Sequence, residues 1–280
     1  MRTIFLLRAF GDFLIAIYSF RNAKNKASVR FVASKHHEAL FKALPKILIP
    51  QDIKIEFVDF GIDKTLLRFF TNKFFFSSKT VQEINKVKKK VKELQFENLF
   101  VEQKMRLNIF KLVTGFPFKS IVDKQNVYKA YSNYFGNEDV QNSKLDFTVT
   151  EESRILILPS TRQLRKDFPA KVLQKISDQS KARTENVTIG FYKFSKRNDK
   201  NCFIYNDFSE LISYVENSDF IICADSLQAH LAQFLEKPHF ILYNNHQTHK
   251  QFLTPFAEQN NSYANFNNLE KLHYVFNASL

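Results

Sequence analysis

Short unbroken runs of apolar residues alternate along the chain with longer segments in which apolar residues recur every three or four positions. The unbroken runs are typical of buried parallel strands, and the three-to-four spacing is typical of amphipathic helices. In the first half the pattern predicts strands over Thr3–Ala9, Ser28–Ser34, Lys54–Phe60, Asn98–Glu102 and Ser120–Asp123. It predicts helices over Phe13–Phe20, His36–Leu44, Val81–Leu94 (after a Thr80/Glu83 capping box) and Leu107–Val113.

The alternation starts again after the polar segment Gly136–Lys144, which is rich in Asn, Asp, Gln and Ser and reads as a linker. Predicted strands in the second half cover Arg154–Leu158, Asn186–Phe191, Cys202–Tyr205, Phe220–Ala224 and Pro238–Tyr243. Predicted helices cover Pro169–Ser180, a segment capped by Asp207 or Ser209 and ending at Val215, Ala229–Leu235, and Leu269–Phe276. Two such series predict an α/β protein with two doubly wound Rossmann-like domains, 1–145 and 146–280, facing each other across a cleft. The last helix could pack back on the first domain.

The charge is distributed unevenly between the two halves. The 280 residues carry a net charge of +13, and residues 1–150 hold 26 Lys and Arg against 14 Asp and Glu. An anionic partner is therefore expected at the first half, with nucleic acid, an anionic membrane surface and a phosphorylated glycolipid all open. The alternative is a general bias toward Lys in the composition, in keeping with 32 Phe and only 5 Gly.

Cysteine usage and hydropathy favour a cytoplasmic protein. Cys202 and Cys223 lie in or beside apolar runs and read as reduced core residues. Arg8 and Asp12 interrupt the apolar amino-terminal stretch, and no run reaches the roughly 18 uncharged apolar residues of a membrane helix. We therefore expect neither a signal peptide nor a membrane span.

Candidate chemistry gathers where predicted strands end. The strand Phe220–Ala224 is followed at once by Asp225-Ser226 and by a helix that carries His230. Gly11-Asp12 follows the first strand in the same way. Ligands bind open α/β sheets at the carboxyl ends of the strands, and a helix N-terminus favours a phosphate there. These positions predict a two-domain enzyme for a phosphorylated donor.

Four landmarks occur in order along nearly the whole chain. They are Gly11-Asp12, the acid-then-Gln stretch Asn98–Gln103, Pro159-Ser160-Thr161 followed by Lys166-Asp167-Phe168-Pro169, and Asp225-Ser226 with His230-Leu231-Ala232. In this order they resemble the heptosyltransferases of bacterial lipopolysaccharide synthesis, glycosyltransferase family nine, which have the GT-B fold. The family has Gly-Pro where this chain has Leu227-Gln228.

The resemblance implies an inverting glycosyltransferase that moves a sugar from an ADP-heptose-like donor to a lipopolysaccharide core or similar anionic glycolipid. Asp12 would be the general base and Gly11 the glycine of the preceding turn. The donor would contact Ser160, Thr161, Lys166, Asp225, Ser226 and His230. The resemblance implies no cofactor and no metal, and nucleic acid is not expected as a partner. Peripheral contact with the cytoplasmic face of the inner membrane is possible.

Each candidate also has a simpler interpretation. Asp12 could cap the helix that follows it, as could Asp225 and Ser226. Lys166 could be a solvated loop lysine, with Arg162 or Arg165 in its place, and His230 could be a satisfied core residue. The lysines between positions 86 and 92 could form an ordinary solvated helix face instead of an anionic-lipid contact. At the level of function, the alternative is a family member that binds a nucleotide or glycan without turnover, and a nucleic-acid binder comes third.

Overall fold

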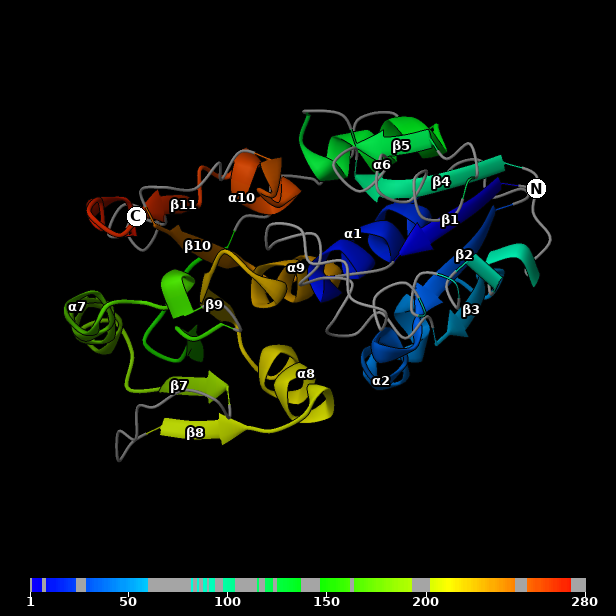
Figure 1. Cartoon of the computed structure of the whole chain (residues 1–280). Helices are drawn as coiled ribbons and strands as arrows, with labels where there is room; N and C mark the ends of the chain where they lie inside the picture. Colours follow the sequence, from blue (N-terminus) through cyan, green and yellow to red (C-terminus); the bar gives the residue numbers. More distant parts are fainter. Residues whose placement is uncertain are drawn as a thin grey trace. The chain divides into compact units, whose positions relative to one another are not determined.

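The computed structural model describes most of the chain in two compact units, Met1–Glu138 and Asp139–Leu280 (Figure 1). The described residues are 2–6, 9–23, 29–59, 82, 85, 88–89, 91–93, 98–103, 115, 119–122, 125–136, 147–161, 164–192, 202–244 and 251–272. The predicted helix Leu107–Val113, the Thr80/Glu83 capping box and Arg162 lie outside them.

The first unit is built on a five-stranded parallel sheet in the order β3-β2-β1-β4-β5. Its strands are β1 (Arg2–Leu6), β2 (Val29–Ser34), β3 (Lys54–Val58), β4 (Asn98–Gln103) and β5 (Lys119–Val122). Its helices are α1 (Phe10–Arg21), the 3-10 turns η1 (Lys35–His37) and η2 (Lys46–Leu48), α2 (Glu38–Ala43) and α6 (Val127–Phe135). All five predicted strands are present, because continuous apolar runs mark strands that are covered on both faces.

Helix α1 is the central helix of this unit and is apolar on nearly every side. Residues 11–20 are all buried, as expected for a helix without a solvent-facing side. Phe20 packs edge-on against Phe31 of β2 and Phe135 of α6, with ring centroids 5.3 and 5.6 Å away. These buried aromatic rings contribute to the hydrophobic stabilisation of the unit.

One predicted boundary in the first unit is wrong, and one helix was not predicted. The helix expected over Phe13–Phe20 begins at Phe10, and Asp12 therefore lies inside its first turn. Helix α6 was not predicted, although its ends carry ordinary signals. Asn126 caps it by accepting from the amide of Tyr128 at 2.9 Å, and Gly136 ends it with φ of 69°.

The predicted lysine-rich helix is confirmed where it is described. Positions 82, 85, 88, 89 and 91–93 are helical. Val91 is fully buried, whereas Lys88, Lys89 and Lys92 are exposed, which is the arrangement that the periodic apolar residues predict.

The second unit is built on a six-stranded parallel sheet in the order β11-β10-β9-β6-β7-β8. Its strands are β6 (Ile155–Leu158), β7 (Val187–Tyr192), β8 (Cys202–Tyr205), β9 (Phe220–Ala224), β10 (His239–Tyr243) and β11 (Tyr263–Asn265). Its helices are η3 (Leu164–Lys166), α7 (Ala170–Lys181), α8 (Phe208–Glu216), α9 (Leu227–Phe234) and α10 (Pro255–Gln259). Asp207, one of the two predicted caps, accepts from the amide of Glu210 at 2.9 Å.

The core of the second unit reaches the end of the described chain. It joins buried residues of the central strands β6 and β9 with Phe168, Phe240, Leu269 and Leu272. Leu269 and Leu272 thus pack in this unit, while the rest of the predicted last helix lies outside the described residues.

A side-chain pair joins the amino ends of β6 and β9. Arg154 donates from its backbone amide, Nε and a terminal nitrogen to the Asp219 carboxylate, at 2.8, 3.0 and 2.9 Å. These hydrogen bonds lower the pKa of Asp219 and hold the two neighbouring strands in register.

His239 is a fully buried histidine at the start of β10. Its Nδ1 lies 2.7 Å from the carbonyl oxygen of Lys237, which can only accept, and Nδ1 therefore carries the hydrogen. Its Nε2 then accepts from the hydroxyl of Thr254 at 2.7 Å. Burial lowers the pKa of His239 from 6.5 to about 4. The folded protein thus holds this ring in its neutral form.

This burial predicts an acid-sensitive contribution to stability. The unfolded chain protonates His239 below pH 6.5 and the folded chain only near pH 4, so the stabilisation is complete above pH 6.5 and is lost as the pH falls toward 4. The full difference corresponds to about 3 kcal/mol. We expect His239→Gln to flatten the decline of unfolding free energy between pH 7 and pH 5, measured by urea unfolding followed by circular dichroism. Thr254→Val, which keeps the histidine, should retain the decline; the same slope in His239→Gln and wild type would contradict the assignment.

Candidate functional site

Each sheet has a switch point, where two neighbouring strands are followed by connections that run in opposite directions. In the second unit this pair is β6 and β9, since β7 and β8 lie on one side and β10 and β11 on the other. Ligands bind doubly wound sheets at the carboxyl ends of such a pair. The residues after β6 and β9 are 159–168 and 225–226, which are the segments that the sequence marks as donor-binding.

Lys166 and Asp225 meet at this switch point. The Lys166 ammonium nitrogen donates to the Asp225 carboxylate at 3.0 Å and to its carbonyl oxygen at 2.7 Å. The two side chains are 19% and 9% exposed. Lys166 is therefore not a solvated loop lysine, and a lysine here presents a positive charge beside the start of α9.

The segment before Lys166 is held by its own contacts. Phe168 is buried in the core, and its amide donates to the carbonyl oxygen of Pro159 at 2.9 Å. Asp167 accepts from the amide of Thr161 at 2.7 Å. The Lys-x-aromatic-Pro element thus uses its aromatic residue as an anchor, and Lys166 is held next to β9.

Gln228, which the sequence marks only as a departure from the family, lies at the centre of the site. It is 4% exposed. Its Nε2 donates to the carbonyl oxygen of Ser160 and to the hydroxyl of Tyr205, both at 2.8 Å, and its Oε1 accepts from the hydroxyl of Ser226. One amide group thereby joins the segments that follow β6 and β9 to the last residue of β8. The members of this strand-end cluster are Ser160, Lys166, Tyr205, Asp225, Ser226 and Gln228.

Ser160 and Tyr205 form the buried side of the strand-end cluster. The Ser160 hydroxyl oxygen accepts from the amide of Tyr192 at 2.8 Å and also contacts the Tyr205 hydroxyl. Burial raises the pKa of Tyr205 far above its ordinary value and keeps the phenol protonated. This geometry favours a supporting role for Ser160, and direct contact of Ser160 or of Thr161 with a ligand stays a prediction.

The capping interpretation of Ser226 is wrong. Helix α9 begins at Leu227, two residues before the predicted start, and Ser226 occupies the N-cap position. Its side chain makes no capping hydrogen bond and donates to Gln228 instead. Asp225 is likewise bonded to Lys166. The first turn of α9 therefore retains the partial positive charge that favours an anion.

His230 is buried, at 5% exposure, in the second turn of α9. It is close enough to His239 for its charge to lower the pKa of that residue, although burial is the larger cause. This placement favours the core-residue interpretation of His230, and its contact with a phosphate stays a prediction.

In the first unit, Asp12 lies at the equivalent place. It follows β1, which has β2 and β3 on one side and β4 and β5 on the other. The side chain is 4% exposed and stands in the first turn of α1, where the helix dipole favours a carboxylate. The capping interpretation is wrong, because Ala9 occupies the N-cap position and makes no side-chain bond.

The prediction of a turn glycine at position 11 is also wrong. Gly11 is the second residue of α1, and the described glycines with positive φ are Gly115 and Gly136. The helix begins early because the apolar residues before and after the Gly-Asp pair continue one buried helical segment. The catalytic role of Asp12 stays a prediction.

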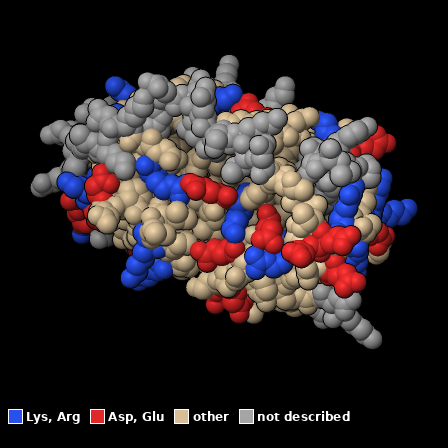
Figure 2. Space-filling view, turned by 180° about the vertical axis from the view of Figure 1, so that it is seen from behind, with Lys and Arg blue, Asp and Glu red and all other residues tan. Residues whose placement is uncertain are grey.

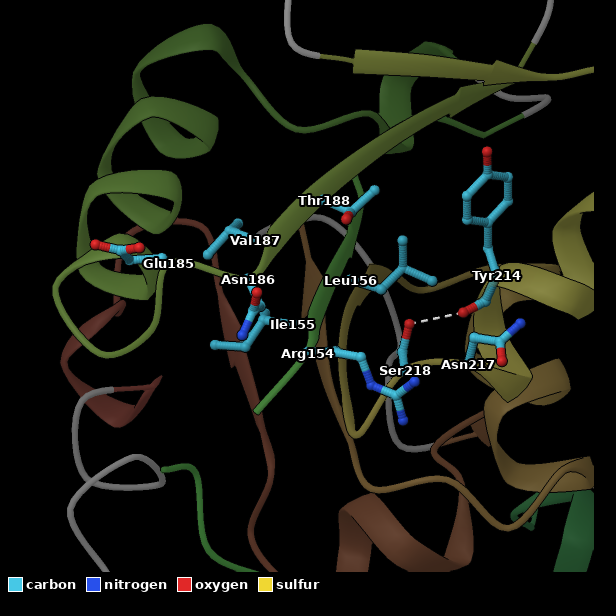
Figure 3. A pocket seen from close by; sticks show the side chains of 10 residues that line it. All are labelled: Arg154, Ile155, Leu156, Glu185, Asn186, Val187, Thr188, Tyr214, Asn217 and Ser218. Carbon is cyan, nitrogen blue, oxygen red and sulfur yellow. Dashed lines mark hydrogen bonds between the residues drawn. The ribbon is translucent and has the colours of Figure 1, made fainter. Parts of the chain in front are cut away.

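A separate pocket of about 410 Å³ opens at the opposite edge of the second sheet (Figure 3). Its lining comes from the starts of β6 and β7 and from the end of α8, where Ser218 donates to the carbonyl oxygen of Tyr214 at 2.6 Å. A helix C-terminus carries partial negative charge and disfavours anions. The strand-end cluster is therefore the better anion site, because it lies at the carboxyl ends of the strands and beside the positive N-terminus of α9.

Within the described parts of the chain, no three His, Cys, Asp or Glu side chains gather closely enough to hold a metal ion. The helices described there include none with the length and apolar character needed to cross a bilayer.

No protein-family model matches the sequence, and no curated protein is similar to it in sequence. In structure the chain is similar to heptosyltransferase WaaC of E. coli with ADP, at 10% identity and a TM-score of 0.59, over 99% of this chain and 100% of that one. It is similar to a family 9 glycosyltransferase from Veillonella parvula, at 12% identity and 0.57, over 100% and 90%. It is also similar to E. coli ADP-heptose lps heptosyltransferase II, at 12% identity and 0.54, over 95% and 90%. The predicted fold class is confirmed, and the chain has the Rossmann-like GT-B fold.

Proposed function

We propose that the protein is a heptosyltransferase-like glycosyltransferase that transfers a sugar from an ADP-linked donor to an anionic glycolipid. The Lys166–Asp225 pair carries the proposal, because it places a cation and a carboxylate at the switch point of a sheet with the GT-B fold. The similar proteins WaaC and heptosyltransferase II are named for ADP or ADP-heptose. The second unit would hold the donor.

In the donor half, Lys166 would neutralise the diphosphate together with the start of α9. Charge that develops on the leaving diphosphate is stabilised best by a fixed cation and backbone amides. Asp225 would accept hydrogen bonds from sugar hydroxyls. Thr161 and His230 are secondary donor contacts in this proposal.

In the acceptor half, Asp12 would act as general base. Its carboxylate takes the proton of the acceptor hydroxyl, and the acceptor oxygen attacks the anomeric carbon from the side opposite the diphosphate. The new carbon–oxygen bond forms as the bond to the phosphate oxygen breaks, and ADP leaves with the electron pair. One displacement inverts the anomeric centre, which requires one base and no covalent intermediate.

The acceptor is proposed from the excess of basic residues in the first half of the chain. A lipopolysaccharide core carries phosphate groups that Lys and Arg attract. On the face drawn in Figure 2, described acidic and basic residues are interspersed, without a single-sign patch among them. We therefore assign the acceptor to the first unit, which has the excess of basic residues, without assigning it to a particular patch of that unit. Cytoplasmic location, with peripheral contact at the inner membrane, belongs to the same proposal, as does transfer without a metal or cofactor.

The test has two stages on the full chain. Isothermal titration with ADP and UDP asks whether the site binds a nucleotide diphosphate and which base it prefers. Release of ADP from ADP-heptose is then measured with and without a heptose-deficient lipopolysaccharide acceptor. We expect ADP binding and acceptor-dependent release; a protein that binds neither nucleotide contradicts the proposal.

Gln228 favours one alternative function. It places a buried amide side chain where the resembling family has proline. A site altered in this way could bind the nucleotide sugar without transferring it. Tight binding of ADP-heptose without acceptor-dependent release of ADP would support this alternative.

A further inference from the structure

We propose that Gln228 is a positioning residue that fixes the hydroxyl oxygen of Ser226 as a hydrogen-bond acceptor for a hydroxyl group of the donor sugar. The inference rests on the proposed function, because it assigns a role within the same site. Proline, which the resembling family has at position 228, cannot form any of the three side-chain hydrogen bonds made here. A family member with proline at this position therefore lacks this role.

The direction of each hydrogen bond follows from the partners of the Gln228 amide. The backbone carbonyl oxygen of Ser160 can only accept, and the amide atom 2.8 Å from it must be Nε2. The other amide atom is then Oε1, which also can only accept. The hydroxyl of Ser226 faces Oε1 and must therefore donate its hydrogen to it.

The second acceptor near Ser226 leads to the same conclusion. The carbonyl oxygen of Ala224 lies 3.4 Å from the Ser226 hydroxyl and is again a pure acceptor. Both partners draw the single hydroxyl hydrogen toward the protein. A half-buried Ser226 thus offers a ligand only the lone pairs of its oxygen.

A serine oxygen that can only accept a hydrogen bond distinguishes a sugar hydroxyl from a phosphate. A sugar hydroxyl can donate to the Ser226 oxygen, whereas an ionised phosphate has no hydrogen to donate and is repelled by it. The diphosphate is left to Lys166 and to the start of α9, where donors and positive charge lie. The Ser226 oxygen therefore selects for the hydroxylated part of the donor.

Rotation of the Ser226 hydroxyl toward a phosphate would be unfavourable. It would leave Oε1 of Gln228 without this donor at a side chain that is 4% exposed. An unsatisfied buried acceptor lowers affinity by about tenfold or more. The Gln228 network thereby maintains the direction of the bond.

Calorimetric titration of the full chain with ADP and with ADP-heptose tests the inference. Ser226→Ala and Gln228→Met should each weaken ADP-heptose binding about tenfold and change ADP binding less than about twofold. The double variant should lose no more than either single variant, since both changes remove one function. Gln174→Met, on the exposed face of α7, is the matched control and should leave both affinities unchanged.

The ratio of the two affinities separates positioning from a general structural effect. Both ligands are titrated into the same sample, and a partly unfolded fraction therefore cancels in the ratio. Equal losses for the two ligands, or no loss in Gln228→Met, would overturn the inference while leaving the proposed function intact. A wild type that binds ADP and ADP-heptose equally would overturn it as well. Failure of the wild type to bind either ligand would instead contradict the proposed function.

Discussion

Asp12→Asn is expected to lower the turnover number for sugar transfer about a thousandfold, the usual size of a general-base contribution. The asparagine side chain has the same shape but cannot take the proton of the acceptor hydroxyl. Because Asp12 stands in the first turn of α1, loss of its charge should lower the unfolding free energy by less than about 1 kcal/mol. Steady-state release of ADP from ADP-heptose in the presence of acceptor measures the effect.

Asp52→Asn is the control for this substitution, since Asp52 is exposed in a turn of the same unit. It should leave turnover unchanged. ADP-heptose should bind Asp12→Asn as tightly as wild type, because the donor is assigned to the other unit. Transfer at the wild-type rate by Asp12→Asn would remove this residue from the mechanism without affecting the donor site.

Lys166→Met is expected to weaken ADP binding about a hundredfold, which is the value of a charge-assisted contact with a diphosphate. The same change leaves Asp225 largely buried without its cation and should lower the unfolding free energy by about 2 kcal/mol. Calorimetry with ADP and urea unfolding measure the two effects separately.

A second substitution distinguishes ligand binding from folding. Lys166→Met combined with Asp225→Asn removes the unpaired carboxylate and should recover most of the lost stability, but not ADP binding. Lys171→Met, an exposed lysine of α7, should change neither quantity. Recovery of ADP binding in the double variant would show that Lys166 serves only to hold Asp225.

Much of the fold could be predicted because the central strands are buried on both faces. Phe220–Ala224 is a strand with the predicted bounds, and all five of its residues are buried. Strand β11 escaped prediction because Tyr263–Asn265 is short and has no apolar run. Helix α10 is also short, yet the Thr254 cap and the proline after it are readable signals that the prediction overlooked.

Several members of the strand-end cluster could be named as candidates from the sequence, but the contacts between them could not. Lys166 and Asp225 were both candidates, but their ion pair joins positions 59 residues apart and depends on β6 and β9 being neighbours. Gln228 and Tyr205 could not be recognised, because glutamine and tyrosine have no local signature of a buried polar network. The early start of α1 was likewise hidden, since glycine weakens the helical signal around Asp12.

Under the proposed function, the two ion pairs at opposite ends of β6 and β9 have different roles. A bound diphosphate would compete with Asp225 for Lys166, whereas the Arg154–Asp219 pair lies at the amino ends of the strands, away from the proposed donor site. Binding of the donor and release of ADP could then move the segments that follow β6 and β9, while the two strands keep their register. The sheet would then stay fixed through the proposed reaction, and conformational change would be limited to the segments that contact the substrates.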